Sequence, residues 1–189
     1  MGIQYSGDDT AKTAQPWLTI GYRIFSQEGP GALHIERLAK QLGKSKSSFY
    51  HHFSDREIFI SKLLDLHFNR AVAIAVKEKD CENAEGLISI LLEHRQDMFF
   101  HRALRYHAKE EMFAKCIEAV DDVTTTAVSG VWARITGLEM NSFLATRLYQ
   151  LQVDSFFLRL DSEDFTARWL AAYFKEVAQM VLEIRRLSA

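Results

Sequence analysis

The side chains best suited to chemistry lie between residues 46 and 53, where hydrogen-bonding groups accompany two aromatic anchors. Phe49 and Phe53 are four residues apart, so a helix can bury both rings on one side. The side chains left for the opposite face are small or can hydrogen-bond: Lys46, Ser47, Ser48, His51 and His52. Such a face suits the major groove of DNA, because bulky apolar residues would block the edges of the bases. The segment is therefore a candidate DNA-reading helix.

A second short helix must hold this reading helix in place. Residues from about 34 to 41 carry an apolar stripe at helical spacing, made of Ile35, Leu38, Ala39 and Leu42. Gly43 follows and suits the left-handed turn that ends a helix, and Ser45 suits the cap of the next helix. Two short helices joined by a tight turn that contains glycine are typical of a helix-turn-helix.

The local charge also fits a polyanionic partner. Residues 34–56 contain five lysines or arginines and two acidic residues, which gives a net charge of +3 with histidine neutral. The whole chain carries a formal charge of −2. Because basic side chains supply contacts to phosphates, we expect a basic footprint that is confined to this segment.

Residues 31–57 resemble the DNA-binding signature of the TetR family of transcription regulators, and the close resemblance covers about residues 15–70. The matching positions are Ala39, Gly43, Ser45, Lys46, Phe49, Tyr50, His52, Phe53 and Glu57. The resemblance implies phosphate contacts from Tyr50, His52 and Arg56, and a major-groove face made of Lys46, Ser47, Ser48 and His51. His34 stands where a threonine usually begins the second helix, and its imidazole could serve the same phosphate contact.

The rest of the chain predicts an all-α protein, since apolar residues recur at helical spacing and strand-like stretches are hard to find. We expect a flexible tail over residues 1–13, a three-helix helix-turn-helix domain over 14–56 and a helical ligand-binding and dimerisation domain over 57–189. Ser54 followed by Glu57 predicts a capping box at the start of a connecting helix. The helices expected are roughly 16–27, 34–41, 46–52, 57–78 (the connecting helix), 83–100, 101–107, 109–136, 139–160 and 163–187.

The last two expected helices each carry two apolar faces, which is more than one packing contact requires. In the resembled family the last two helices form a dimer interface, so we expect a two-helix dimerisation face. The residues predicted for this interface are Leu144, Leu148, Leu151, Tyr173, Phe174, Val177 and Val181. The alternative is that both faces are buried within one chain.

The middle of the chain, residues 83–136, mixes large apolar side chains with polar ones. The resemblance implies a pocket for a small-molecule effector here, and pockets are mostly apolar with a few polar fixtures. The candidate pocket residues are Phe99, His101, Arg105, Phe113 and Trp132. Each of these residues could equally be part of a plain hydrophobic core.

The sequence gives little support for an enzyme, a metalloprotein, a secreted protein or a membrane protein. It has no His-Glu-x-x-His zinc motif, no glycine-rich phosphate loop and no serine in a nucleophile elbow. His107 and Glu110 lie one helical turn apart but have no further ligand beside them. Cys81 and Cys116 fit free thiols in a reduced, cytoplasmic protein. We find no secretion signal and no apolar run near the ~20 residues that a membrane span needs.

We therefore expect no catalysis, metal or cofactor, but a cytoplasmic transcription regulator that binds double-stranded DNA and a small-molecule effector. The expected form is a repressor that binds a near-palindromic operator as a homodimer, although an activator role stays open. The alternatives are a ligand-binding module of the same fold that does not bind DNA, and a small helical enzyme.

Overall fold

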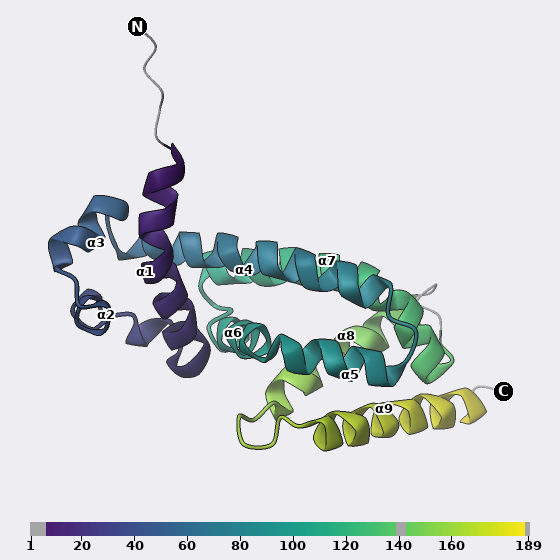
Figure 1. The fold of residues 1–189 in the computed structure, drawn as a ribbon. Helices are drawn as coiled ribbons and strands as arrows, with labels where there is room; N and C mark the ends of the chain where they lie inside the picture. The colour runs from purple at the N-terminus through teal and green to yellow at the C-terminus, as the bar shows by residue number, and fades with distance from the viewer. Residues whose placement is uncertain (1–6, 139–142, 188–189) are drawn as a thin grey trace, which may run out of the picture.

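The computed structural model describes the backbone of residues 7–138 and 143–187 (Figure 1). Within these ranges every regular element is a helix, which confirms the predicted all-α class. α1 and the short helices that follow it form a unit at one end of the molecule, and the later helices form a bundle that makes up the rest (Figure 1).

The unit at the N-terminal end consists of α1 (Gly7–Glu28), the 3-10 helix η1 (Pro30–Ala32), α2 (Ile35–Leu42) and α3 (Lys46–His52). We call it the helix-turn-helix unit. α1 begins at Gly7, so residues 7–13, predicted as part of a flexible tail, are helical. The start of α1 projects beyond its neighbours (Figure 1), and a projecting turn needs no apolar stripe by which the sequence would mark it as helical. Residues 1–6 of the predicted tail lie outside the described residues.

α4 (Arg56–Lys79) connects the helix-turn-helix unit to the bundle and runs along its length beside α7 (Figure 1). Its cap is Asp55, whose carboxylate accepts a 2.8 Å hydrogen bond from the backbone N–H of Ile58. The predicted capping box placed Ser54 in this role. Ser54 instead donates a 3.1 Å hydrogen bond to Asp55, since a carboxylate is the stronger acceptor for the free N–H groups of a helix start.

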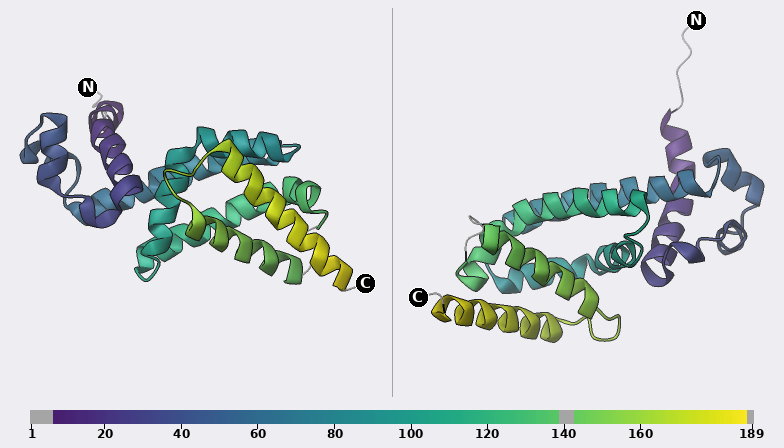
Figure 2. Two further views of the ribbon diagram at one scale, coloured as in Figure 1. Left: turned by 90° about the horizontal axis from the view of Figure 1, so that it is seen from below. Right: turned by 180° about the vertical axis from the view of Figure 1, so that it is seen from behind.

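The bundle contains α5 (Ala84–Glu93), α6 (Arg95–Tyr106), α7 (Glu111–Thr136), α8 (Phe143–Arg159) and α9 (Ala167–Leu187). α7 packs along α4, and α9 packs on α5 and α7. The two final helices lie together on one flank of the molecule (Figure 2). This flank is where the sequence analysis expected a dimerisation face.

The boundary between the fifth and sixth helices differs from the one predicted, whereas the end of α7 agrees with the prediction. The break between α5 and α6 falls at His94, not between residues 100 and 101. The N–H of His94 still bonds to Ile90, and the carbonyl of His94 accepts from Asp97, so the break is one turn without a glycine or proline to mark it. α7 ends at Gly137 as predicted, where the backbone is left-handed with φ 69°. The predicted start of the next helix, residues 139–142, lies outside the described residues.

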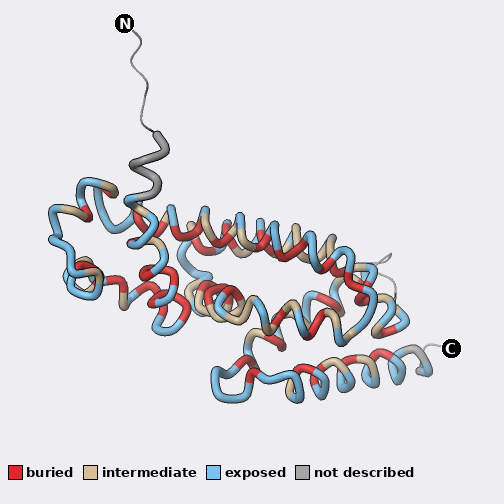
Figure 3. Tube along the Cα trace, in the orientation of Figure 1, coloured by how far each residue is buried: buried red, intermediate tan, exposed pale blue. Residues whose placement is uncertain are grey.

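Buried side chains form two apolar clusters, which Figure 3 shows as red segments on facing sides of the helices. The first cluster joins α1, α2 and α3 to α4, α6 and α7. Within it, the rings of Phe25 in α1 and Phe100 in α6 stack with centroids 4.1 Å apart. The second cluster lies among α5, α7, α8 and α9. The helix-turn-helix unit therefore shares a core with the bundle instead of being joined to it by a linker alone.

Candidate DNA interface and ligand cavity

α3 is fixed by one buried side and leaves its other side free. Phe49 is completely buried and meets the ring of Trp17 edge to face at 5.4 Å. The N-cap Ser45 accepts a 3.2 Å hydrogen bond from the N–H of Ser48 and so closes the first turn, as predicted. The predicted major-groove face is accessible: Lys46, Ser47 and His51 are exposed and Ser48 is half-buried. We call these four side chains the reading face.

The turn before α3 depends on one glycine. Gly43 ends α2 with φ 62° and ψ 29°, a left-handed conformation in which an L side chain is strained. A Cβ atom at this position would meet no other atom within 4 Å, so the backbone alone requires glycine. This geometry brings α2 and α3 together as a helix-turn-helix.

The predicted phosphate-contacting residues lie around the reading face but differ in how far they are exposed to solvent. Tyr50 is 53 % exposed, and His34 is exposed at the start of α2 without capping it. His52 is half-buried, and burial together with the charges of His51 and Lys44 lowers its pKa. Its neutral imidazole therefore offers a phosphate a single N–H donor.

Arg56, which is predicted to contact a phosphate, also forms hydrogen bonds within the protein. Its Nε donates a 3.2 Å hydrogen bond to the carbonyl of Leu33, and its Nη2 donates to the carbonyl of Pro30. The guanidinium therefore ties the first turn of α4 to the segment between α1 and α2. Lys46 forms a 2.8 Å ion pair with Glu36, and this exposed pair is weak enough to exchange for a phosphate.

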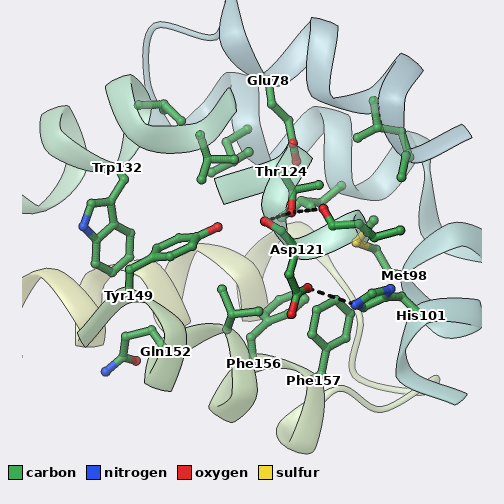
Figure 4. Close-up of a pocket in the computed structure, with 18 of the residues that line it drawn as sticks. Glu78, Met98, His101, Asp121, Thr124, Trp132, Tyr149, Gln152, Phe156 and Phe157 are labelled. Atoms are coloured by element: carbon green, nitrogen blue, oxygen red, sulfur yellow. Dashed lines mark hydrogen bonds and ion pairs between the residues drawn. The ribbon is translucent and has the colours of Figure 1, made fainter. Parts of the chain in front are cut away.

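A cavity opens inside the bundle and is lined by residues of α4 to α9 (Figure 4). It holds about 970 Å³ of space free of protein atoms, part of which is open to solvent. Its wall is mostly apolar and aromatic, with rings from Trp132, Tyr149, Phe156, Phe157, Tyr173 and Phe174. A few polar side chains interrupt this wall, which is the usual composition of a small-molecule site.

Two of the five predicted pocket residues, His101 and Trp132, line this cavity. Phe99, Arg105 and Phe113 do not line it. Their prediction failed because helical periodicity identifies an apolar face but not the neighbour that this face contacts. Phe113 packs edge to face on Phe25 at 5.9 Å in the first cluster, and Phe99 packs on Phe165 at 5.7 Å. Arg105 does not line this cavity, and its guanidinium binds Asp121 at 2.5 Å and Asp154 at 2.5 Å.

Glu78 of α4, which was not predicted as a site residue, also lines the cavity and points toward Thr124 of α7 (Figure 4). Its side chain is only 5 % exposed, and its Oε2 has no hydrogen-bond partner. Burial raises the pKa of Glu78 to about 7. The signal was present in the sequence, since Glu78 continues the buried positions Ala71, Ile74 and Ala75 at helical spacing.

A polar network joins the helix-turn-helix unit to the cavity. Tyr22 of α1 donates a 2.6 Å hydrogen bond to Asp97, and its hydroxyl lies 2.7 Å from Nδ1 of His67. Nε2 of His67 lies 3.2 Å from Nδ1 of His101, and Arg70 donates a 2.7 Å hydrogen bond to Asp97. His67, Asp97 and His101 all line the cavity.

The charges of this network are set by burial and by its own hydrogen bonds. Burial opposes ionisation of Asp97, but the hydrogen bonds from Arg70 and Tyr22 outweigh it and hold the pKa of Asp97 below its ordinary value. Burial and the neighbouring His101 lower the pKa of His67 far below its usual range. The network thus contains a carboxylate, a guanidinium and a neutral imidazole.

The predicted dimer residues fall on two different sides of α8 and α9. Tyr173, Val177 and Val181 are buried within the chain itself. Leu148 and Phe174 are half-buried, and Leu151 is 63 % exposed. The side chain of Leu144 lies outside the described residues. The large apolar side chains exposed on these helices are Phe143, Leu151, Leu158, Met180, Leu182 and Ile184.

Three further expectations concern classes of site. Cys81 and Cys116 are both free and buried, as predicted. Across residues 7–138 and 143–187, no three His, Cys, Asp or Glu side chains are grouped in a way that could hold a metal ion. None of the described helices is both long enough and apolar enough to cross a membrane.

Comparisons with known proteins agree with this geometry. Residues 18–61, which run from the second half of α1 through α2 and α3 into α4, match the family described as bacterial regulatory proteins, tetR family. A search of curated proteins finds no match to the chain. The segment that carries the resemblance in the sequence is thus the segment that matches this family, and the resemblance is confirmed over these residues.

Solved structures extend the likeness to the whole fold. A TetR/AcrR-family transcriptional regulator from Aquifex aeolicus is 15 % identical with a TM-score of 0.60, over 91 % of this chain and 99 % of that one. The TetR-family transcriptional regulator PfmR from Thermus thermophilus is 18 % identical with a TM-score of 0.60, over 86 % of this chain and 97 % of that one. The chain therefore has the fold of TetR-family transcriptional regulators, including the bundle beyond the matched segment.

Proposed function

We propose that this protein is a ligand-responsive transcription repressor that binds a near-palindromic operator as a homodimer. The observation that carries the proposal is the accessible reading face of α3, held by the buried ring of Phe49 within the segment that matches the family. A polar helical face on a rigid support is what base recognition in the major groove requires.

On DNA, Lys46, Ser47, Ser48 and His51 face the bases, while the remaining predicted contacts bind phosphates. Tyr50, His52 and His34 flank the reading face and position it on the sugar–phosphate backbone. Arg56 contributes to phosphate binding from the position in which it also holds the segment before α2.

The proposed dimer joins two copies of the chain through α8 and α9. Leu151 and Leu158 of α8 and Met180 and Ile184 of α9 are exposed large apolar side chains, which are costly to leave in water. A two-fold interface built on them pairs the same surface of both copies and sets the distance between two reading faces. Of the other predicted dimer residues, Leu148 is half-buried on α8, and Phe174 is half-buried and lines the cavity.

The cavity in the bundle is the proposed effector site. An effector changes DNA binding only if it binds the DNA-competent and the released geometries with different affinity. The Tyr22–Asp97–His67 network and the Phe25–Phe100 stack connect the cavity wall to α1. Movement of α6 in response to a ligand would therefore displace the helix-turn-helix unit.

The first alternative is a ligand-binding module without DNA binding, and the exposed polar reading face argues against it. The comparisons favour a regulator over the second alternative, a helical enzyme.

Binding of a duplex that the wild-type protein selects from random sequences tests the proposal. The double variant Lys46→Ala, Tyr50→Ala should lose at least tenfold in affinity, because it removes two charged or hydrogen-bonding contacts to DNA. The matched control is Tyr106→Ala, Lys115→Ala, which removes the same residue types from exposed positions on α6 and α7. Unchanged affinity in the first variant, or an equal loss in both, would overturn the assignment of α3.

A further inference from the structure

The unpartnered carboxylate of Glu78 indicates the chemical class of the effector. Burying a carboxylate without a partner is costly, so a lone carboxylate in a cavity calls for an explanation in terms of what it binds. Glu78 extends from α4 into the cavity (Figure 4), and its Oε2 is buried without a hydrogen-bond partner. The missing partner is thus a group that enters from the cavity side.

The other carboxylates of the cavity wall already have cationic partners. Asp97 accepts a 2.7 Å hydrogen bond from Nη2 of Arg70, and Asp121 accepts one of 2.7 Å from Nη2 of Arg105. The described residues that line the cavity include no lysine or arginine. No side chain of the cavity wall therefore offers Glu78 the positive charge that a cationic ligand would bring.

The wall around Glu78 suits an apolar cation better than a hydrated one. Trp132 and Tyr149 pack edge to face at 5.1 Å, and Phe156 and Tyr173 do so at 5.5 Å, so aromatic faces and edges surround the space. The faces of aromatic rings attract cations and exclude water, which strengthens the attraction further. A hydrated metal ion would find few oxygen ligands on such a wall.

We propose, on the basis that this cavity is the effector site, that the effector is a lipophilic organic cation. Its positive charge pairs with Glu78, and its apolar body lies against Trp132, Tyr149 and Phe156. A neutral effector that accepts a hydrogen bond from protonated Glu78, and an anionic one, are the competing classes.

Two ions of nearly equal size and shape but opposite charge separate these classes. Isothermal titration of the full-length protein at pH 8 with tetraphenylphosphonium should show saturable binding, whereas tetraphenylborate should bind at least tenfold more weakly. The comparison uses the wild-type protein and so does not depend on the folding of any variant. Equal binding of the two ions, tighter binding of the anion, or binding of neither ion would overturn the inference.

The variant Glu78→Gln then tests the residue itself. It keeps the shape of the side chain and removes the charge, so its affinity for tetraphenylphosphonium should fall at least tenfold. The matched control is Glu118→Gln on the exposed side of α7, which should bind like the wild type. Unchanged affinity in Glu78→Gln, with circular dichroism confirming its fold, would show that Glu78 does not pair with the cation.

DNA binding measured without any ligand distinguishes failure of this inference from failure of the proposed function. A protein that binds its selected duplex but ignores tetraphenylphosphonium is a regulator with another class of effector. Binding of the cation through Glu78 without binding of DNA would support the proposed cation site and contradict the proposed role as a DNA-binding regulator.

Discussion

The hydroxyl of Tyr22 in α1 donates a 2.6 Å hydrogen bond to Asp97 in α6. Tyr22 belongs to the helix-turn-helix unit, and Asp97 lines the cavity of the bundle. Burial and the negative charge of Asp97 raise the pKa of Tyr22, so the hydroxyl keeps its proton and remains a donor. One buried contact thus links the two parts of the molecule that the proposed regulation must couple.

The variant Tyr22→Phe tests this link, because it removes the donor and keeps the ring that stacks on Phe100 at 4.1 Å. Loss of a buried hydrogen bond to a charged acceptor should lower the free energy of unfolding by about 1–3 kcal/mol. An effector should also change the operator affinity of the variant less than that of the wild type. Urea denaturation and DNA titration with and without tetraphenylphosphonium measure the two effects.

Tyr106→Phe is the matched control, since Tyr106 is 58 % exposed and is not among the proposed DNA contacts. It should leave the free energy of unfolding within experimental error of the wild type. If Tyr22→Phe had the stability of the wild type and the same response of operator affinity to the effector, the Tyr22–Asp97 contact would neither stabilise the fold nor couple the cavity to the helix-turn-helix unit.

A second prediction concerns Glu78 and the dependence of stability on pH. Its pKa is about 7 in the folded protein and about 4.5 when exposed, so between these values the folded state holds a proton that the unfolded state has released. Rising pH therefore removes stability through Glu78. The free energy of unfolding of Glu78→Gln, relative to the wild type, should rise by up to about 3 kcal/mol between pH 4.5 and pH 7.

The comparison of variant and wild type isolates Glu78 from its neighbours. The other titratable side chains on the cavity wall are His67 of α4, Asp97 and His101 of α6, Asp121 of α7, Tyr149 of α8 and Tyr173 of α9. Burial lowers the pKa of both histidines, so they destabilise the fold as pH falls, opposite in sign to Glu78. A stability difference that stays constant from pH 4.5 to pH 7 would refute the burial of an ionisable Glu78.

A third prediction concerns the turn of the helix-turn-helix. Gly43→Ala should destabilise the protein by about 1–2 kcal/mol, because alanine is strained at a φ of 62°. Gly31→Ala is the matched control, since a Cβ at Gly31 also meets nothing within 4 Å and its φ is not positive. Thermal unfolding compares the two variants, and equal melting temperatures would contradict the assigned turn conformation.

A fourth prediction concerns the dimer. Leu158 is 72 % exposed on α8, so Leu158→Glu should leave the fold intact and give monomers, because a charge in a two-fold interface faces its own copy. Val76→Glu, at an exposed position 61 % accessible on α4, should remain dimeric. Light scattering with circular dichroism as the folding control measures both. A wild-type protein that is monomeric at micromolar concentration would contradict the proposed interface.

The parts of the fold that the sequence predicted correctly depend on local patterns. The Gly43 turn, the Ser45 cap and the burial of Phe49 are encoded within ten residues, so spacing alone located α2 and α3. The break at His94 carries no local signal, because no glycine or proline stands at or beside this position. Its position had to come from the structure.

The cavity and the dimer flank were harder to predict for a related reason. Phe99, Phe113 and Trp132 are all large apolar residues of one region, yet only Trp132 lines the cavity. Val177 and Val181 belong to an apolar stripe that the chain buries within itself. Helical spacing identifies a buried face but not what covers it, since that depends on contacts far apart in the sequence.

The central claim is that two copies of α3 read a symmetric site on DNA, and selection from a pool of random duplexes tests it most directly. The account predicts a near-palindromic sequence whose half-sites are separated by whole helical turns, roughly 34–36 Å each. Failure to enrich any duplex, or enrichment of a single unpaired half-site, would contradict it.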